Sequence, residues 1–279
     1  MPLTGCSRAT RGAPAALRQT EGMRIDIATA PGDPARPNED FASVAVPASG
    51  QGGALVVLDG VTPPPEGYGC AHTVPWYVAR LGGALGELSV SRRDLTLRKV
   101  LAEAIGRTAD AHRGTCDLSH PRTPQTTVVL ARWDAEHVEY LVLSDSALLL
   151  EAPDGVVRAI LDDRLVRLPR EALTSAAVAD ATVRNREGGF FTAAADASVA
   201  ERAVAGVVAR DRVRSIAALT DGATRWVDRF GEGDWSQCLA LLRKEGAQSL
   251  LDAVRARECA SAEGPGKTHD DATATYVEL

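Results

Sequence analysis

The chain has 279 residues, of which 45% are hydrophobic and 24% charged, a composition typical of a globular protein with a substantial core. Its net charge of −6 and its pI near 5.5 argue against nucleic acid or an anionic membrane as the main partner, because both require a basic surface. Apolar runs such as residues 54–58 are far shorter than the roughly twenty residues of a membrane-spanning helix. We therefore expect neither a nucleic-acid-binding nor a membrane-spanning protein.

The N-terminal 22 residues are predicted to form a disordered tail, since they contain basic residues but no apolar segment of the kind that a secretion signal has. Met23 directly precedes the first strand-like segment, which suggests that the native chain starts there. No targeting signal is visible, so the cytoplasm is the default location. Residues 23–279 show no repeat or linker and are expected to form a single domain.

The cysteines are Cys6, Cys70, Cys116, Cys238 and Cys259. Their odd number and the absence of C-x-x-C spacing suit a reducing compartment and argue against both a disulfide framework and a thiolate zinc site. Cys70 is expected to be a small core residue of a helix. Of the histidines, His72 is expected to have a core or capping role, and His269 to lie on the surface beside a turn.

The first half of the predicted chain begins with two short strands within residues 24–48 and a third at 54–58, which runs into Asp59-Gly60. Helices are expected at residues 70–85 and 94–112. Strands return at residues 125–133, 137–146 and 147–161. These three are expected to form a meander, with hairpin turns at Asp134-Ala135 and Asp154-Gly155.

The second half begins with a polar, basic and weakly patterned segment, residues 162–190, in which we expect a mobile flap. Then follow a predicted short helix at 197–209, a strand at 215–222, helices at 235–246 and 247–262, and a last strand at 271–279. Strands grouped in meanders, with helices grouped between them, indicate an α+β fold in which stacked antiparallel β-sheets are flanked by helices.

Acidic residues stand where predicted strands end or begin: Asp59, Asp145, Asp221 and the pair Asp270-Asp271. Strands that lie side by side bring their ends together, so these acids are expected to crowd at one edge of the sheets. A single Asp-Gly pair after a strand is a common turn. A cluster of carboxylates, by contrast, repels itself unless protons or cations offset the charge, which favours a cation site.

Six short motifs occur in a specific order: Asn38-Glu39-Asp40, Asp59-Gly60, Thr126-Thr127, Ser144-Asp145-Ser146, Thr220-Asp221-Gly222 and Asp270-Asp271-Ala272-Thr273. In this order the chain resembles the metal-dependent serine/threonine phosphatases of the 2C type, in particular the bacterial ones, over about residues 23–279. The resemblance implies two stacked antiparallel sheets flanked by helices, with two Mg²⁺ or Mn²⁺ ions at one edge.

The resemblance also implies ligands for these ions. Asp59 would bridge both ions, the Gly60 carbonyl would bind one of them, and Asp221 and Asp270 would complete the other. Asp270 is preferred to Asp271 because the family's acid stands three residues before a threonine or serine, which is Thr273 in this chain.

Further roles follow from the same resemblance. Asp145, with help from Asp221, would bind a weaker third ion. Glu39 and Asp40 would accept hydrogen bonds from metal-bound waters, and Arg36 would bind the phosphate of the substrate.

The chain departs from the family pattern at several positions, among them Ser144, which stands where the family usually has a glycine. Val61 stands where the family often has a histidine that acts as a general acid, and Ala147 stands where an arginine is common. Arg225 replaces an acid that is often found four residues after the aspartate of the Asp-Gly motif, which weakens the third-metal assignment.

The function that the resemblance implies is a Mg²⁺- or Mn²⁺-dependent phosphomonoesterase that acts on phosphoserine or phosphothreonine in proteins through a water activated by two metals. One alternative is a phosphatase for a phosphorylated small molecule. Another is a pseudophosphatase, a binding module that holds a partner or phosphorylated ligand without turnover. Nothing in the sequence indicates an oligomeric state.

Overall fold

Two five-stranded sheets form the centre of the protein in a computed structural model that describes residues 23–47, 52–64, 67–260 and 268–279. One sheet has the order β2-β3-β4-β5-β8, the other has the order β1-β10-β9-β6-β7, and all neighbouring strands are antiparallel. The strands are β1 (Ile25–Ala30), β2 (Phe41–Ala45), β3 (Gly53–Leu58), β4 (Val128–Trp133), β5 (His137–Leu143), β6 (Ala147–Glu151), β7 (Val157–Ile160), β8 (Val204–Ala209), β9 (Ser215–Leu219) and β10 (Ala272–Glu278). The predicted α+β fold with stacked antiparallel sheets is confirmed.

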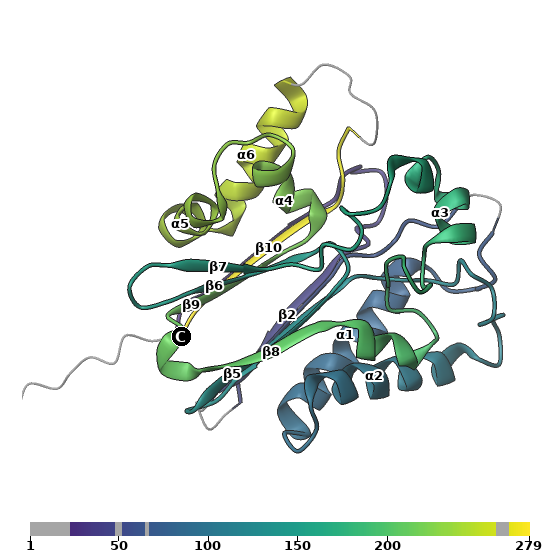
Figure 1. Cartoon of the computed structure of the whole chain (residues 1–279), viewed down its shortest axis with the longest axis horizontal. Helices are drawn as coiled ribbons and strands as arrows, with labels where there is room; N and C mark the ends of the chain where they lie inside the picture. Colours follow the sequence, from purple (N-terminus) through teal and green to yellow (C-terminus); the bar gives the residue numbers. More distant parts are fainter. Residues whose placement is uncertain (1–22, 48–51, 65–66, 261–267) are drawn as a thin grey trace, which may run out of the picture.

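Helices cover the outer face of each sheet, which gives four layers (Figure 1). The α-helices of the described chain are α1 (Val74–Ser91), α2 (Leu97–His112), α3 (Ala176–Thr182), α4 (Asp221–Asp228), α5 (Trp235–Glu245) and α6 (Ala247–Ala260). Helices α1 and α2 pack on the sheet that contains β3, whereas α4, α5 and α6 pack on the sheet that contains β9. The expected disordered tail, residues 1–22, lies outside the described residues.

Hydrophobic side chains fill all three interfaces between the layers. In β4, Val128 and Leu130 pack against α1 and α2, whereas Val129 and Ala131 pack against the second sheet. Successive side chains of a strand point to opposite faces, so a strand that is covered on both sides needs a continuous apolar run rather than an alternating one. Because the central strands are covered on both sides, they have the continuous apolar runs that predict strands in the sequence.

The ends of the strands place the acidic motifs on one edge of the sandwich. Asp59 directly follows β3, Asp145 lies between β5 and β6, and Asp221 begins α4 just after β9. Asp270 lies two residues before β10. Antiparallel pairing of β9 with β6 and β10, and the stacking of this sheet on the sheet that contains β3, therefore bring together residues that are up to about 210 positions apart in the sequence.

Two predictions about the elements were wrong. The expected helix at 197–209 is a 3₁₀-helix, η2 (Ala197–Arg202), followed by the edge strand β8, which pairs with β5. Gly206 of β8 pairs with Tyr140 of β5, and the tyrosine side chain packs directly over it: a Cβ on Gly206 would lie 2.3 Å from the Tyr140 hydroxyl oxygen. In addition, β5 and β6 do not belong to one meander, because the Ser144-Asp145-Ser146 turn crosses from one sheet to the other.

The segment 162–190, predicted as a mobile flap, contains the 3₁₀-helix η1 (Arg170–Leu173) and α3. It lies beside the edge of the sheets that carries the acids, and Leu165, Leu173 and Ala179 line a cavity together with Asp59. Its mobility remains a prediction, as does the assignment of residues 23–279 to a single domain. Among the described residues, no helix is both long and apolar enough to cross a membrane.

Candidate functional site

The backbone of Asp59 is fixed by the residues that open β4. Thr126 Oγ1 donates a hydrogen bond to the Asp59 carbonyl oxygen at 2.8 Å, and the Asp59 amide donates to Thr127 Oγ1 at 3.2 Å. Thr127 Oγ1 is also 2.6 Å from Ser146 Oγ, which lies just after Asp145. The Thr126-Thr127 motif thus holds Asp59 and the Asp145 turn next to each other.

Close approach of the chain, rather than turn geometry, requires the glycine that follows Asp59 and the glycine that follows Asp221. A Cβ on Gly60 would lie 2.4 Å from Val74 Cγ1 and 2.5 Å from the Glu39 carbonyl oxygen. A Cβ on Gly222 would lie 2.0 Å from the Asp271 carbonyl oxygen. Neither glycine has a positive φ, so the common turn interpretation of Asp-Gly does not apply to these motifs.

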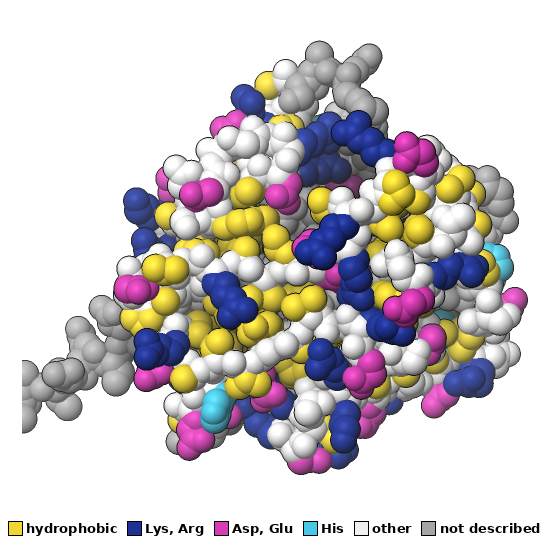
Figure 2. Space-filling model, in the orientation of Figure 1, with side chains coloured by type: hydrophobic (Ala, Val, Ile, Leu, Met, Phe, Trp, Pro, Cys, Tyr) yellow, Lys and Arg dark blue, Asp and Glu magenta, His cyan; other side chains and the backbone are white. Residues whose placement is uncertain are grey.

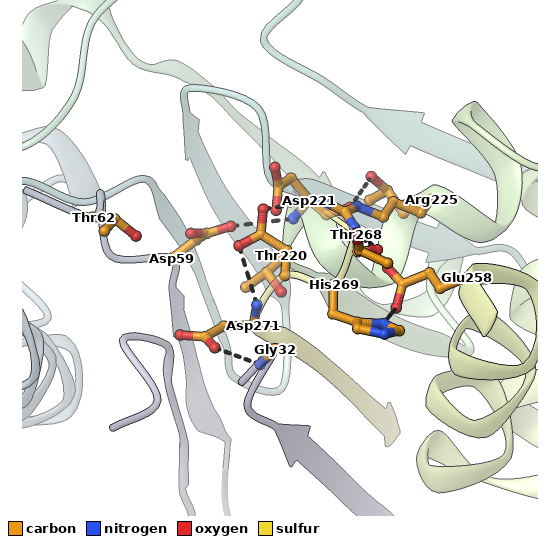
Figure 3. Close-up of polar contacts among 12 residues, drawn as sticks. Gly32, Asp59, Thr62, Thr220, Asp221, Arg225, Glu258, Thr268, His269 and Asp271 are labelled. Atoms are coloured by element: carbon orange, nitrogen blue, oxygen red, sulfur yellow. Dashed lines mark hydrogen bonds and ion pairs between the residues drawn. The ribbon is translucent and has the colours of Figure 1, made fainter. Parts of the chain in front are cut away.

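The acids at the strand ends form one partly buried cluster. The Asp221 amide donates to Asp59 Oδ2 at 3.3 Å, and the two carboxylates lie close together in Figure 3. Burial raises the pKa of Asp59 well above its ordinary value, and repulsion from Asp221 and other acids adds to this effect. Burial, together with repulsion from Asp145 and Asp270, raises the pKa of Asp221 to about 7. Burial likewise raises the pKa of Asp145.

Asp40 lies beneath this cluster and is held by two threonines. Its Oδ2 accepts hydrogen bonds from Thr220 Oγ1 at 3.0 Å and from Thr273 Oγ1 at 2.7 Å. Its Oδ1 is buried and has no hydrogen-bond partner within the described part of the chain. Burial raises the pKa of Asp40 to about 7, opposed by the two threonine hydrogen bonds and increased by repulsion from neighbouring acids.

The neighbouring acids Asp270 and Asp271 have different surroundings. Asp271 Oδ1 accepts a hydrogen bond from the Gly32 amide at 2.7 Å (Figure 3). Its Oδ2 accepts one from the Glu39 amide at 2.6 Å, so both carboxylate oxygens bind backbone amides. Asp270, by contrast, lines the same cavity as Asp59 and Asp221. This difference fits the choice of Asp270 rather than Asp271 as a candidate ligand.

A buried ion-pair network contacts Asp270 from the opposite side. Arg225 Nη2 lies 3.0 Å from Asp270 Oδ2, and its Nη1 lies 2.6 Å from Glu258 Oε1. Glu258 is fully buried and also binds Arg255 and His269, both through Oε2. His269 therefore points to α6 and pairs with an acid, instead of lying free beside a turn. A guanidinium thus stands beside a candidate metal ligand.

Two cavities that share Asp270 and Thr62 meet at the acids. The smaller, about 340 Å³, is lined by Asp59, Gly60, Asp145, Asp221 and Asp270, among other residues. The larger, about 830 Å³, is lined by Arg36, Glu39, Tyr68, Asp270 and Asp271, among other residues.

The remaining predicted residues lie in the larger cavity. Glu39 Oε2 accepts a hydrogen bond from Thr62 Oγ1 at 2.7 Å. Arg36 lies at the rim, with 73% of its side chain exposed and its Nε 3.8 Å from Asp33 Oδ2. The structure therefore gathers the predicted site residues around the two cavities, except Asp40, which lines neither of them. Arg36 is the most peripheral.

Two arginines that the sequence did not indicate also line the smaller cavity. Arg122 and Arg184 each bind Asp180 of α3 at 2.7 Å, and both are largely buried. Figure 2 shows further Lys and Arg side chains on the surface between α3 and helices α4–α6. Both arginines stand in weakly patterned segments of the sequence. Only their position in the fold identifies them as neighbours of the acids.

The donor set fits hard divalent cations. Asp59, Asp221, Asp145 and Asp270 supply carboxylate oxygens, Gly60 can supply a carbonyl oxygen, and such oxygen ligands are those that Mg²⁺ and Mn²⁺ prefer. Carboxyl groups with pKa values near 7 would bind protons at neutral pH unless a cation replaced them. The Arg225–Asp270 pair is the feature that fits least well, because it competes for one of the candidate ligands.

No protein-family model matches this chain, and no curated protein sequence does. Solved structures do resemble it. The serine/threonine phosphatase Stp1 from Staphylococcus aureus is 14% identical, with a TM-score of 0.59 over 92% of this chain and 95% of that one. A serine-threonine phosphatase 2C from Toxoplasma gondii is 15% identical, with a TM-score of 0.60 over 92% and 94% of the two chains.

A third similar structure is PppA from Pseudomonas aeruginosa, described as a key regulatory component of T6SS. It is 20% identical, with a TM-score of 0.53 over 92% of this chain and 97% of that one. At such low identity the likeness concerns the fold alone. The chain therefore has the fold of the serine/threonine phosphatases of the 2C type, which confirms the resemblance that the motifs indicated.

Proposed function

We propose that this protein is a Mg²⁺- or Mn²⁺-dependent phosphomonoesterase that dephosphorylates phosphoserine or phosphothreonine in proteins. The observation that carries the proposal is the partly buried cluster of Asp59, Asp221, Asp145 and Asp270, since so many carboxylates in one place call for cations. The cluster lies at one end of a sandwich with the phosphatase 2C fold.

In this proposal, Asp59 would be a ligand of both ions, the Gly60 carbonyl would be a ligand of one, and Asp221 and Asp270 would be ligands of the other. The ions, when bound, would lower the pKa of a water, orient it for in-line attack on phosphorus and offset the charge of the transition state. Asp145 is the candidate ligand for a weaker third ion.

The residues around the ligands would orient water. Asp40 Oδ1, which lacks a partner among the described residues, is free to accept a hydrogen bond, while Oδ2 is fixed by two threonines. Glu39 would act in the same way from the larger cavity, where Thr62 orients its carboxylate. Residues that hold metal-bound waters in one orientation typically affect metal affinity or activity by 10- to 100-fold.

Arginine is the side chain best suited to bind the substrate's phosphate, because its planar fork matches two phosphate oxygens. Arg36 is the proposed phosphate ligand, since its exposed side chain can reorient at the cavity rim at the cost of a long contact to Asp33. Arg122 and Arg184 are already committed to Asp180, so they would add positive potential rather than direct contacts.

Val61 offers no proton to a leaving alkoxide, so the departing serine or threonine oxygen would take its proton from water in the larger cavity. That cavity has a volume of about 830 Å³ and lies next to the acids, which supports a protein substrate whose phosphorylated side chain would enter it. A phosphorylated small molecule remains the alternative substrate.

The Arg225–Asp270 pair favours a second candidate, a pseudophosphatase that binds a phosphorylated ligand without turnover. Hydrolysis of p-nitrophenyl phosphate by the purified protein, with Mn²⁺ and with EDTA, separates the two candidates when Asp221→Asn serves as the control for contaminating phosphatase. The phosphatase proposal requires turnover that depends on Mn²⁺ and is lost in the variant. Mn²⁺ binding without turnover on this ester and on phosphopeptides would favour the pseudophosphatase.

A further inference from the structure

Four potential metal ligands meet at a place separate from the acid cluster. Cys70 and His72 precede α1, His112 is the last residue of α2, and Cys116 follows four residues later. In the sequence they form two short motifs, Cys-x-His and His-x₃-Cys, which are separated by 39 intervening residues. The antiparallel packing of α1 and α2 brings the start of one helix next to the end of the other.

The ligand atoms are close enough to share one ion. All four lie within 4.8 Å of one another. Cys70 Sγ is 3.4 Å from His112 Nδ1 and 3.7 Å from His72 Nδ1, and Cys116 Sγ is 3.3 Å from His72 Nδ1. Zinc bonds of about 2.0–2.3 Å in a tetrahedron place ligand atoms about 3.3–3.8 Å apart, so these three separations suit a zinc site.

The two sulfur atoms are closer to each other than that, 3.0 Å apart, and are not bonded as a disulfide. Negative charge on two neighbouring thiolates would be repulsive, and a dication between them removes the repulsion. A bound ion would therefore widen the sulfur–sulfur separation slightly and leave the other contacts in place.

The surroundings of the cluster support thiolates and fixed imidazoles. The Ala71 amide donates to Cys116 Sγ at 3.3 Å, and the His72 amide donates to Cys70 Sγ at 3.4 Å. Trp76 stacks on the His72 ring with centroids 4.0 Å apart. His112 is only 2% exposed, and its Nε2 has no hydrogen-bond partner among the described residues. Such a histidine is positioned by its Nδ1 contacts with sulfur.

We propose that Cys70, His72, His112 and Cys116 bind one Zn²⁺ ion in a tetrahedral site, with both histidines ligating through Nδ1. Two sulfur and two nitrogen ligands are typical of zinc, and four protein ligands leave no open position, as in structural rather than catalytic sites. The ion would clamp the segment before α1 to the end of α2.

The position of this clamp connects it to the acid site. Tyr68, Thr73 and Val74, which flank Cys70 and His72 in the chain, line the larger cavity. The zinc would therefore hold one wall of the cavity while making no contact with the acids. The cysteine spacing argued against a thiolate zinc site, because neither half contains C-x-x-C and the halves meet only through helix packing.

The first test uses the untagged full-length protein. Metal content after purification should be about one zinc per chain, and it should stay so in Asp221→Asn, which impairs the acid cluster. Replacement by Co²⁺ should produce the visible bands of tetrahedral cobalt and a near-ultraviolet sulfur-to-cobalt band. Wild-type protein with neither zinc nor a cobalt–thiolate band would overturn the proposal, whatever the phosphatase activity.

The second test locates the ion. Cys70→Ser/Cys116→Ser should lose zinc at least tenfold, because structural sites lose affinity strongly without their thiolates. Cys259→Ser, which changes an exposed cysteine of α6 outside the cluster, should retain it. Zinc that persists in the double variant, or a Cys70–Cys116 disulfide in the native protein under non-reducing mass spectrometry, would contradict the site. If the double variant fails to fold, the wild-type cobalt spectrum decides alone.

Discussion

Arg225 donates a hydrogen bond from Nη2 to Asp270 Oδ2 at 3.0 Å, while its Nη1 binds the buried Glu258. The guanidinium is largely buried and is fixed by these two acids. The Arg225 guanidinium is thus a positive charge at the edge of the proposed metal site. It neutralises part of the negative charge of the carboxylates, which a bound cation would otherwise neutralise. This pair leads to a prediction about metal affinity.

Arg225→Gln should increase the affinity for Mn²⁺ by about tenfold or more, since a unit charge a few ångströms away in a partly buried site is worth about 1–4 kcal/mol. The variant should also lose roughly 1–3 kcal/mol of stability, because Glu258 loses one of its partners. Mn²⁺ titration by calorimetry, alongside urea unfolding, measures both effects.

The matched control is Arg243→Gln. Arg243 also pairs with a buried acid, Glu151, but at the far end of β6 from Asp145. It should lose comparable stability without any change in Mn²⁺ affinity. Superimposable metal titrations for Arg225→Gln and the wild type would show that Asp270 is not a ligand.

Asp59→Asn should abolish catalysis while the fold remains. In the proposed site this carboxylate would be a ligand of both ions, which would contribute several kcal/mol to transition-state stabilisation, so kcat should fall by about 10²-fold or more. The stabilisation that Mn²⁺ gives the wild type in thermal unfolding should shrink in the same variant. Near-normal turnover in Asp59→Asn would remove Asp59 from the mechanism.

The metal-free protein should become less stable as the pH rises. Burial and repulsion raise the pKa of Asp40 and of Asp221 from 3.8 to about 7, so the folded state binds protons that the unfolded chain releases between these values. Stability in EDTA should therefore fall from about pH 4 to pH 7, by up to about 1.4 kcal/mol per pH unit for each group.

Unfolding by urea at pH 5 and pH 7.5 measures this slope. Mn²⁺ should flatten the slope or reverse it, because the ion replaces the protons on the same carboxylates. An EDTA-treated protein that is more stable at pH 7.5 than at pH 5 would be inconsistent with a protonated acid cluster.

Arg36→Ala should raise KM for a phosphopeptide severalfold with little change in kcat, because it removes ground-state phosphate binding. Arg24→Ala is the matched control. Arg24 is another partly exposed arginine paired with an aspartate, and it lies just before β1 and lines neither cavity. Steady-state kinetics of both variants suffice. An unchanged KM in Arg36→Ala would direct attention to Arg184, which lies beside Asp145.

Ser144 has a φ of +71°, a left-handed conformation that favours glycine, in the turn that crosses between the sheets. Ser144→Gly should therefore be about 1 kcal/mol more stable than Ser144→Ala, since both lose the hydroxyl contact with Asp145 but only glycine relieves the backbone. Equal unfolding midpoints for the two variants would indicate that the turn is unstrained.

The sequence was sufficient to predict the sheets and the acid cluster because both depend on local patterns. Continuous apolar runs mark β3, β4 and β9, and the acids stand immediately beside strand ends. The stacking of the two sheets then brings Asp59, which follows β3 of one sheet, next to Asp221, which follows β9 of the other. Where the local pattern was ambiguous, as in the alanine- and valine-rich segment of β8, pairing with β5 decided the structure.

The contacts that the sequence did not indicate are those between distant helices. The pairing of Arg225 with Asp270 depends on Glu258 of α6, and the approach of His72 to Cys116 depends on the packing of α1 against α2. Neither set has a fixed sequence spacing. Both sets of contacts depend on how the helices pack in the fold.

The most direct test of the proposed two-metal phosphatase is to count Mn²⁺ ions and turnover in the same samples. Wild-type protein stripped with EDTA and titrated with Mn²⁺ should release phosphate from a phosphothreonine peptide in proportion to occupancy of two sites per chain. Asp59→Asn should show neither the paired sites nor the release. Phosphate release that is unaffected by EDTA, or full Mn²⁺ occupancy with no release from any phosphopeptide, would contradict the account.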